Sequence, residues 1–272
     1  MGNDINTPAI EVNYFSFEMK ADTDISICIT GAPCNIEIDN KKEIQWNVFT
    51  LEKGQHLKIE NIIRGSRVYI CIANGIEVTY IHGSCSYDST LNIGDKVETN
   101  QIIGLKKVNL KREGYKLNKV LIPKYGTSWN INYCSGPDED TFKKHRVFFE
   151  ESQFEVSLNS NHVGIRLNNV KLKYFKPKNI VSRGIIPGAI EITPEGQPII
   201  LHRGRGGTIG YPVIGCVSTV DLDRIGQVRP GDKVFFKKIS IDEAIEKQKM
   251  QNKQIKEVLR HSQKLNQEVK DV

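Results

Sequence analysis

The segment LHRGRGGTIGYP (201–212) places Arg203 and Arg205 among four glycines. Guanidinium groups bind carboxylates and phosphates through paired hydrogen bonds, and glycines let a ligand or another backbone approach closely. The spacing G-x-G-x-x-x-G differs from that of dinucleotide loops, and the β-branched run after Tyr211 and Pro212 predicts a strand where such a loop needs a helix. We therefore expect a strand-connecting loop, either an anion site or a solvated basic turn.

Two further segments combine polar groups with turn-forming residues. NHVGIRLNN (161–169) places Arg166 in an apolar strand, where it must face a carboxylate, a bound anion or solvent because unpaired burial is costly. SRGIIPGAIEITPEGQP (182–198) is rich in glycine and proline. Its polar groups include Ser182, Glu191 and Gln197. None of these segments shows the Ser-His-Asp or Cys-His spacing of nucleophilic catalysis.

The six cysteines and six histidines form no metal-binding pattern, since neither C-x-x-C nor H-E-x-x-H occurs. Four cysteines lie in strand-like apolar runs such as ISICIT and VYICIA. Free cysteines behave as small buried hydrophobes. We expect reduced, structural thiols.

The elements that position these residues are predicted to be mainly short strands. Apolar and β-branched residues alternate or cluster in AIEVNYFSFEM, NIEID, HLKIE, VYICI, NINYC, FEVSL, VKLKYF, GAIEI, PIIL and DKVFF. Strands this short and numerous, without long helices between them, predict antiparallel sandwiches or barrels.

Two helices are expected. One covers 140–151, with Asp138 or Asp140 as its N-cap. The other begins at Ser240, which forms a capping box with Glu243. The polar stretch EKQKMQNKQ within this second helix indicates that its last turns lie on the surface or fray.

A possible duplication links IGDKV (93–97) with PGDKVFF (230–236), about half the chain apart. Both place Gly-Asp in a tight turn that we expect a strand to follow. This favours two related β domains, with their boundary in the basic stretch 106–126.

The composition is that of an ordinary globular protein, with 272 residues, 39% hydrophobic and 26% charged content, and a net charge of +6. The charge is compatible with anionic ligands or an acidic partner and too diffuse to indicate nucleic acid. No apolar run reaches the ~18 residues of a membrane span, and the first residues lack a signal-peptide pattern. We expect a cytoplasmic protein without a membrane partner.

The segment 182–236 resembles the signature of the biotin-dependent carboxyltransferase (KipA-like) family. That family includes the C subunit of 5-oxoprolinase, proteins once named allophanate hydrolase subunit 2, and part of the carboxyltransferase domain of urea carboxylase. Its pattern runs roughly S-x-G-x-x-P-G-A-I-Q-x-P-x-x-G-Q-P-I-x-L-x-x-D-x-Q-T-x-G-G-Y-P. NHVGIRL, SGPDEDTF and GSCSYDS are similar to further motifs, and the likeness extends over about residues 1–245.

The resemblance implies a mainly β fold with two cyclophilin-like β-barrel subdomains, to which the residue pattern adds a few short helices and a C-terminal helix. The first subdomain would cover 1–110, the second 111–240, and a helical tail 241–272. The family's V-Q-D-x-G-R segment has no counterpart here, so we expect the first subdomain to lack its N-terminal strands and to leave a sheet edge for another chain to fill.

The resemblance also implies a function. The chain would be a subunit of a 5-oxoprolinase-like complex that hydrolyses an amide or lactam, or of a biotin-dependent carboxyltransferase. Expected partners are a KipI-like protein (of the 5-oxoprolinase B-subunit type), a possible third subunit and a small amide substrate. The complex would use ATP, and carboxybiotin on a separate carrier in the carboxyltransferase case. The alternative is a diverged, non-catalytic scaffold for the KipI-like partner.

Six residues would line the site, holding a planar amide or carboxylate and stabilising negative charge on oxygen. The residues implied by the resemblance are Asn161, Arg166, Ser182, Gln197, Thr208 and Tyr211. Three positions depart from the family pattern: Gly204 replaces an Asp, Gly206 a Gln and Glu191 a Gln. The two glycines and the missing N-terminal segment favour the scaffold, whereas the retained Asn161, Arg166, Thr208 and Tyr211 favour an enzyme.

Overall fold

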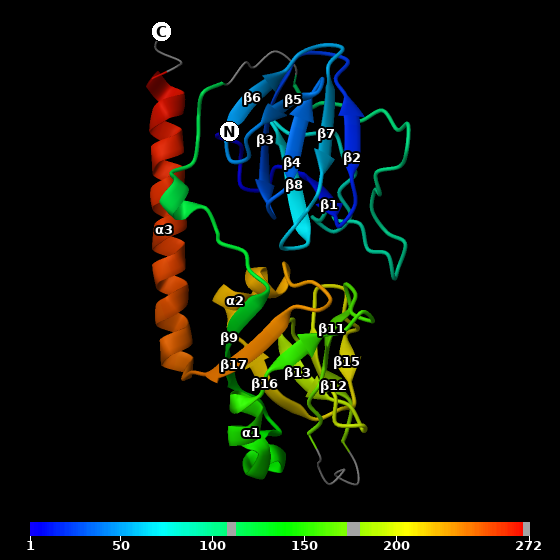
Figure 1. Ribbon diagram of the computed structural model, residues 1–272, viewed down its shortest axis with the longest axis vertical. Coiled ribbons are helices and arrows are strands. Elements are labelled where there is room, and N and C mark those ends of the chain that lie inside the picture. The colour runs from blue at the N-terminus through cyan, green and yellow to red at the C-terminus, as the bar shows by residue number, and fades with distance from the viewer. Residues whose placement is uncertain (108–112, 173–179, 269–272) are drawn as a thin grey trace. The chain divides into compact units, whose positions relative to one another are not determined.

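The computed structural model describes residues 1–107, 113–172 and 180–268. It divides into two compact units, Met1–Tyr125 with Lys256–Val272, and Gly126–Ile255. Strands dominate both units, which confirms the prediction of a mainly β protein (Figure 1).

The first unit contains two four-stranded antiparallel sheets, ordered β1-β8-β3-β6 and β2-β7-β4-β5. Its strands are β1 (Ile10–Asn13), β2 (Phe17–Lys20), β3 (Ile25–Gly31), β4 (Asn35–Ile38), β5 (Lys41–Glu43), β6 (Val48–Leu51), β7 (His56–Glu60) and β8 (Arg67–Ile72). Alternate residues of β8 are buried, as the period-2 pattern requires. One core forms between the sheets, where Ile29, Leu57 and Ile70 are fully buried.

The second unit is built on a closed barrel in the order β10-β11-β14-β13-β16-β9-β17. Its strands are β9 (Ser128–Ser135), β10 (Phe154–Val156), β11 (Gly164–Asn168), β13 (Ala189–Ile192), β14 (Pro198–Leu201), β16 (Val213–Val217) and β17 (Lys233–Lys238). All neighbours are antiparallel except β9 and β17. Aromatic rings fill one end of the core, with Phe149 stacked on Phe236 at 4.6 Å between centroids.

A two-stranded ribbon accompanies the barrel. It consists of β12 (Arg183–Gly184) and β15 (Thr208–Ile209), which pair antiparallel. Ile185 and Ile209 pack against a cluster of buried barrel residues. That cluster comprises Ala189, Ile199, Leu201 and Val213. The ribbon is therefore anchored by apolar contacts to the barrel.

The predicted helix over 140–151 is only partly α-helical. A 3₁₀ helix, η2 (Glu139–His145), precedes α1 (Arg146–Glu151). Asp138 stands at the N-cap position but makes no side-chain cap bond, because its carboxylate is used elsewhere. A short 3₁₀ helix, η1 (Lys119–Leu121), lies in the first unit.

The second predicted helix is α3 (Ile241–Glu268). Its capping box is present: the Ser240 amide donates to Glu243 Oε2 at 2.7 Å, and the Glu243 amide donates to Ser240 Oγ at 3.1 Å. A further helix, α2 (Thr219–Ile225), was not predicted.

The proposed repeat is matched only in its turns. Gly94 and Gly231 both have positive φ, 90° and 88°. A strand, β17, follows the second turn, but residues 96–98 form none, so that part of the prediction is wrong. Val97 is 39% exposed, whereas Val234 is fully buried in the barrel. VKLKYF is also not a strand over 170–172, and its remaining residues lie outside the described part of the chain.

All six cysteines are free thiols. Burial raises the pKa of Cys28 and Cys34 to about 12, which suppresses thiolate chemistry. Across the described residues, carboxylate, histidine and cysteine side chains do not gather in a set that would hold a metal ion. Nor does any helix there combine the length and apolar character of a membrane span.

Candidate functional site

Asp138 joins three of the motifs singled out in the sequence. Its Oδ2 forms an ion pair with Arg183 of SRGIIPG and accepts a hydrogen bond of 2.7 Å from the amide of Val213, next to GYP. The Asp138 amide in turn donates to the Val213 carbonyl at 3.1 Å. Asp138 thus fixes the ribbon and the end of the 201–212 loop to the segment that precedes η2.

Backbones approach closely beside this carboxylate. A Cβ at Gly136 would contact the Val213 carbonyl oxygen and lie 2.6 Å from the Gly215 amide nitrogen. Any side chain at position 136 would therefore push β16 away. The glycine of SGPDEDTF is explained by this packing.

Three of the predicted site residues lie in the ribbon or beside it in sequence. Thr208 pairs with Gly184, and a Cβ at Gly210 would lie 3.7 Å from Ser182 Oγ. Ser182 and Thr208 are exposed, and Tyr211 is 40% exposed. These three residues therefore lie on neighbouring backbone segments, and their side chains are accessible to a ligand or to another protein.

The 201–212 loop connects β14 to the ribbon and to β16, as predicted. The Arg205 Nε donates to the Ile185 carbonyl at 3.1 Å, so Arg205 stabilises the ribbon. Arg203 is exposed. Because the loop leads into strands, it does not form the helix N-terminus of a phosphate-binding site.

A fourth predicted residue, Asn161, shapes a neighbouring turn. Its Oδ1 accepts hydrogen bonds from the amides of Val163 (2.9 Å) and Gly164 (3.2 Å). This turn contacts the loop, since the His202 amide donates to the Val163 carbonyl at 2.9 Å. In the structure Asn161 therefore has a conformational role.

His162 occupies the space beside Gly204. The Gly204 amide donates to the His162 carbonyl at 2.9 Å. A Cβ at position 204 would contact the His162 ring and lie 3.0 Å from its carbonyl oxygen. A side chain at position 204, such as the Asp of the family pattern, would therefore clash with His162 as it is placed here.

Arg166, Ile199 and Glu191 occupy paired positions on three neighbouring strands and so form one row of side chains across the barrel wall. The strand register pairs Arg166 with Ile199, and Ile199 with Glu191. In the neighbouring row Ile190 and Ile200 are fully buried inside the barrel, so the Arg166 row faces outward. Arg166 is exposed there, whereas Glu191 is only 5% exposed.

Glu191 has unusual electrostatics. Burial raises the pKa of Glu191 to about 7, and the positive charge of Arg166 offsets only part of this increase. Its Oε2 is buried and finds no hydrogen-bond partner among the described residues. A carboxyl group with such a pKa exchanges its proton near neutral pH. The sequence singled out Glu191 as a polar group of the 182–198 segment and as a departure from the family pattern, but not its burial.

Gln197 lies at the opposite end of β14 from the loop. Its Nε2 donates to Asn168 Oδ1 at 2.8 Å, and its amide donates to Thr193 Oγ1 at 3.2 Å. The structure therefore gathers Ser182, Thr208 and Tyr211 near the loop and separates them along the barrel from Gln197.

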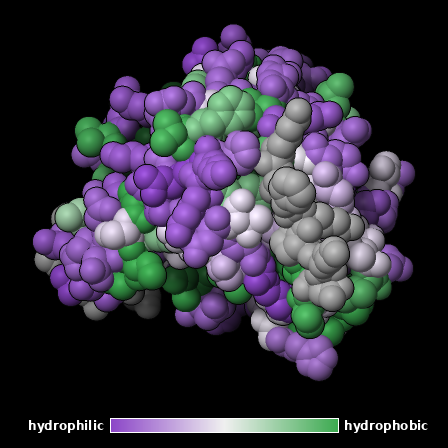
Figure 2. Space-filling view, turned by 90° about the horizontal axis from the view of Figure 1, so that it is seen from below, coloured by the Kyte–Doolittle hydropathy of each residue, from purple (hydrophilic) through white to green (hydrophobic). Residues whose placement is uncertain are grey.

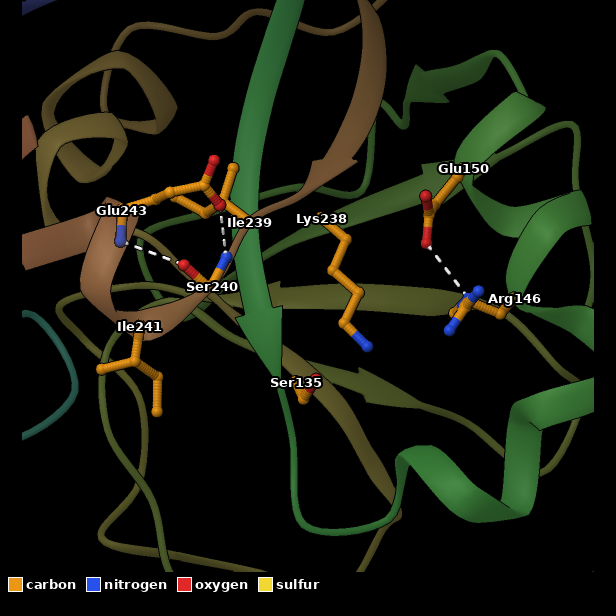
Figure 3. A pocket seen from close by; sticks show the side chains of 8 residues that line it. All are labelled: Ser135, Arg146, Glu150, Lys238, Ile239, Ser240, Ile241 and Glu243. Atoms are coloured by element: carbon orange, nitrogen blue, oxygen red, sulfur yellow. Dashed lines mark hydrogen bonds and ion pairs between the residues drawn. The ribbon is translucent and has the colours of Figure 1, made fainter.

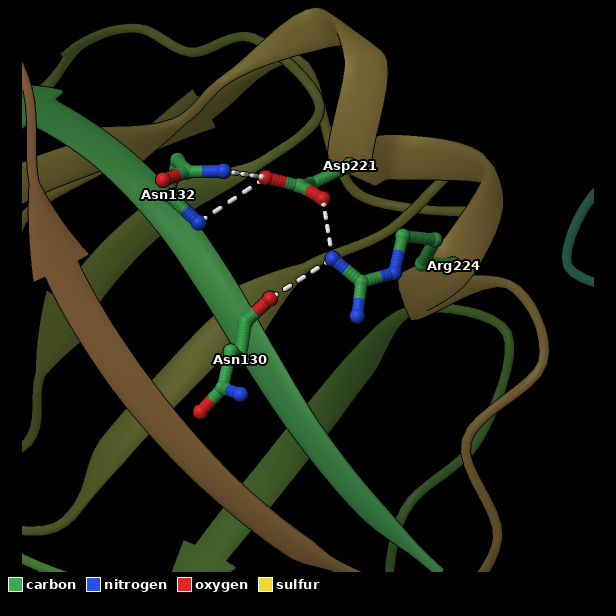
Figure 4. Close-up of polar contacts among 4 residues, drawn as sticks. All are labelled: Asn130, Asn132, Asp221 and Arg224. Carbon is green, nitrogen blue, oxygen red and sulfur yellow. Dashed lines mark hydrogen bonds and ion pairs between the residues drawn. The ribbon is translucent and has the colours of Figure 1, made fainter. Parts of the chain in front are cut away.

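A polar network missed by sequence reasoning attaches α2 to β9 (Figure 4). Asp221 is 2% exposed and accepts hydrogen bonds from the amide and the Nδ2 of Asn132, at 2.9 and 2.7 Å. Arg224 pairs with Asp221 at 2.7 Å and also donates to the Asn130 carbonyl. The signal was the pattern Ser218-x-x-Asp221, which is typical of a helix N-terminus.

A pocket of about 400 Å³ opens beside β17 and the start of α3 (Figure 3). It is lined by Ser135, Arg146, Glu150, Lys238, Ile239, Ser240, Ile241 and Glu243. Glu150 pairs with Arg146, and Lys238 pairs with Glu139. Burial alone would raise the pKa of Glu139, but hydrogen bonds from Lys238 and Ser135 lower it below its usual value. The charges of the pocket are thus largely satisfied internally.

The space-filling view shows mostly hydrophilic residues, with hydrophobic ones in separate groups (Figure 2). Exposed apolar side chains of the second unit include Val147, Phe148, Val181 and Ile186. Val181 and Ile186 flank the ribbon in sequence, so apolar surface lies close to Ser182.

The fold and these motifs define the class of protein. A family model described as carboxyltransferase domain, subdomain A and B, matches residues 1–238. The chain belongs to this family.

Named relatives support the assignment. The chain is 30% identical over 250 residues to the 5-oxoprolinase C subunit of Escherichia coli, covering 90% of this chain and 79% of that one. It is 28% identical to urea amidolyase of Saccharomyces cerevisiae, covering 89% of this chain but 14% of the relative. The Kluyveromyces lactis urea amidolyase structure shares the fold, with a TM-score of 0.85 and 24% identity over 93% of this chain and 17% of that one.

Proposed function

We propose that the chain is a subunit of a 5-oxoprolinase-type complex that opens a small cyclic amide with the use of ATP. The observation that carries this proposal is the similarity to the C subunit of 5-oxoprolinase, which extends over 79% of that protein. The much smaller covered share of urea amidolyase makes carboxyl transfer the second candidate.

The site would form at the ribbon. Ser182, Thr208 and Tyr211 offer hydroxyl groups that donate to an amide oxygen as negative charge develops on it. Because these residues are exposed, a KipI-like partner of the B-subunit type would cover the ribbon and exclude water. Arg166 and Glu191 supply a cation and a proton-exchanging carboxyl group on the outer barrel face. Asn161 and Gln197 would hold the surrounding turns.

No nucleotide site is assigned to this chain. The 201–212 loop leads into strands and so does not form the helix N-terminus that binds phosphate in nucleotide-binding loops, and no step is routed through ATP here. In the carboxyltransferase alternative, carboxybiotin would arrive on a separate carrier. A cytoplasmic location fits the six free thiols.

A non-catalytic scaffold is the alternative that a specific observation favours. Gly204 and Gly206 stand where the family pattern has Asp and Gln, and His162 fills the space beside Gly204. A scaffold would still bind the KipI-like partner through the same surface.

Co-expression with a KipI-like protein and any third subunit separates these possibilities. We expect a stable complex that hydrolyses 5-oxoproline only with ATP, and no biotin-dependent carboxylation. A stable complex with both activities at background would support the scaffold. Carboxylation without hydrolysis would support the second candidate.

A further inference from the structure

Cys134 and Cys216 lie opposite each other on neighbouring strands of the barrel. The antiparallel register of β9 and β16 pairs these two residues directly. Two positions further along, the amide of Gly136 donates to the Ile214 carbonyl at 2.9 Å. Hydrogen-bonded pairs recur at every second position of an antiparallel ladder, so Cys134 and Cys216 form such a pair as well.

The spacing of this pair suits a disulfide. The Cα atoms of a hydrogen-bonded antiparallel pair are about 5.5 Å apart, and disulfides join Cα atoms roughly 4.4 to 6.8 Å apart. The Cys134 thiol now donates to the Ser240 carbonyl oxygen at 3.8 Å, and the Cys216 thiol to the Pro187 carbonyl oxygen at 3.9 Å. Thiols are weak donors, so rotation of the two side chains toward each other breaks little.

Both thiols are accessible from the outer face of the barrel. Tyr133 and Val217, their neighbours in sequence, are buried, so alternation along the strands directs Cys134 and Cys216 outward. Both cysteines are partly exposed. Cys134 also contacts Ser240, which lines the pocket of Figure 3. A molecule as small as hydrogen peroxide can therefore reach this thiol.

We propose that Cys134 and Cys216 are a site of reversible oxidative modification, at which hydrogen peroxide converts the two thiols into a disulfide within the chain. One sulfur attacks the peroxide, breaks its O–O bond and becomes a sulfenic acid as water leaves. The other sulfur then displaces the hydroxyl group as a second water. The two thiols lose two electrons and two protons, and the peroxide gains them. Exchange with small thiols restores the reduced pair.

The pair is reduced at rest. Burial, and to a smaller extent the neighbouring Cys134, raises the pKa of Cys216 to about 11. Burial and the charge of Glu243 also raise the pKa of Cys134. Since the thiolate is the reactive form, both thiols react slowly at neutral pH. The disulfide therefore forms only while an oxidant persists.

The disulfide would brace the frame of the candidate site. Cys134 precedes Asp138 by four residues, and Cys216 follows Val213 by three. Asp138 and Val213 already hold the two segments together by hydrogen bonds. The covalent bond adds a second link between them, whether or not the chain is part of a catalytic complex.

A second cross-strand pair provides an internal comparison. Cys28 and Cys71 lie opposite each other on β3 and β8, in the same kind of register. Cys28 is buried, however, and burial raises its pKa to about 12. We expect this pair to oxidise more slowly than Cys134 and Cys216.

Peptide mapping of the full chain after treatment with hydrogen peroxide tests the site. Free thiols are blocked under denaturing conditions, and linked peptides are identified by mass spectrometry. We expect Cys134 and Cys216 to be linked within one chain and released by dithiothreitol. Cys134→Ser and Cys216→Ser should each abolish the link. Cys34→Ser is the matched control and should leave it unchanged, since Cys34 is also partly exposed but lies outside the strands.

Several results would overturn the proposal. The two thiols could stay free under the oxidant, or each could be oxidised to a sulfinic acid without a link. A link between two chains, or a link between Cys28 and Cys71 that forms first, would equally contradict it. Non-reducing electrophoresis separates links within a chain from links between chains. Circular dichroism checks that the serine variants keep the fold.

Discussion

Glu191 carries a buried carboxyl group in β13, shortly after the turn at Gly188 in the signature segment. Its side chain is 5% exposed, with Oε2 unsatisfied within the described residues. The family pattern has a glutamine here, which fits the same space without a charge. The chain therefore keeps an ionisable group where a neutral amide would cost less to bury, which is typical of a functional position.

Glu191→Gln should change stability in a pH-dependent way. Burial raises the pKa of Glu191 to about 7, so the folded state holds the proton more tightly than the unfolded chain does. The free energy of unfolding should then fall as the pH rises from the usual carboxyl range toward 7, and the variant should not show this fall. Relative to wild type, urea unfolding should show little difference at pH 5 and a gain of about 1–3 kcal/mol at pH 8.

Glu151→Gln, at an exposed position, serves as the control and should leave the stability similar at both pH values. An equal effect of Glu191→Gln at pH 5 and pH 8 would show that its carboxyl group titrates normally.

Gly204→Asp tests the steric coupling to His162. A Cβ there would contact the His162 ring, so we expect a loss of about 1–2 kcal/mol in the free energy of unfolding. His162→Ala in the same chain should recover most of it. Gly207→Asp is the matched control, because a Cβ at Gly207 meets nothing within 4 Å. The denaturant midpoints of Gly204→Asp, the double variant and Gly207→Asp measure these stabilities. Additive losses in the double variant would contradict the steric clash between position 204 and His162.

Among the elements, strands with a strong local pattern could be predicted from the sequence. HLKIE, VYICI and PIIL form β7, β8 and β14, because alternating or continuous apolar residues specify a pleated surface. The capping box at Ser240 was equally local. The residues after Gly94 were mispredicted, because a turn motif alone does not supply the partner strand that β17 finds in β9.

Helix α2 depends on Asp221 for its attachment to β9. Asp221→Ala would leave the Asn132 amide and Arg224 without this acceptor, so the free energy of unfolding should fall by about 2–4 kcal/mol. Asp223→Ala is the control on the same helix, since Asp223 is exposed. Thermal or urea unfolding measures both. A similar small loss in the two variants would mean that the network of Figure 4 does not hold α2 in place.

At the scale of the molecule, the fold class followed from the sequence, whereas the meeting of motifs at Asp138 did not. Asp138, Arg183 and Val213 are far apart in the chain, and only the closed barrel brings them together. The candidate site was predicted residue by residue from resemblance. The structure groups Ser182, Thr208 and Tyr211 but places Gln197 at the other end of β14, which spacing alone does not reveal.

The exposure of the ribbon predicts that the chain needs a partner for activity. Because its polar groups lie on the surface, the isolated chain should be inactive, and activity should appear only when a partner covers them. The same reasoning predicts that partner binding protects Thr208 and Ile209 from amide hydrogen exchange. Unchanged exchange in a purified complex would place the partner elsewhere.

The most direct test of the account is the rate at which a reconstituted complex converts 5-oxoproline into glutamate. The chain would be mixed with its KipI-like partner and third subunit, with and without ATP, and each subunit would be omitted in turn. The account predicts glutamate formation that requires ATP and this chain. Glutamate formation at the same rate without this chain, or none from a complex shown to be assembled, would contradict it.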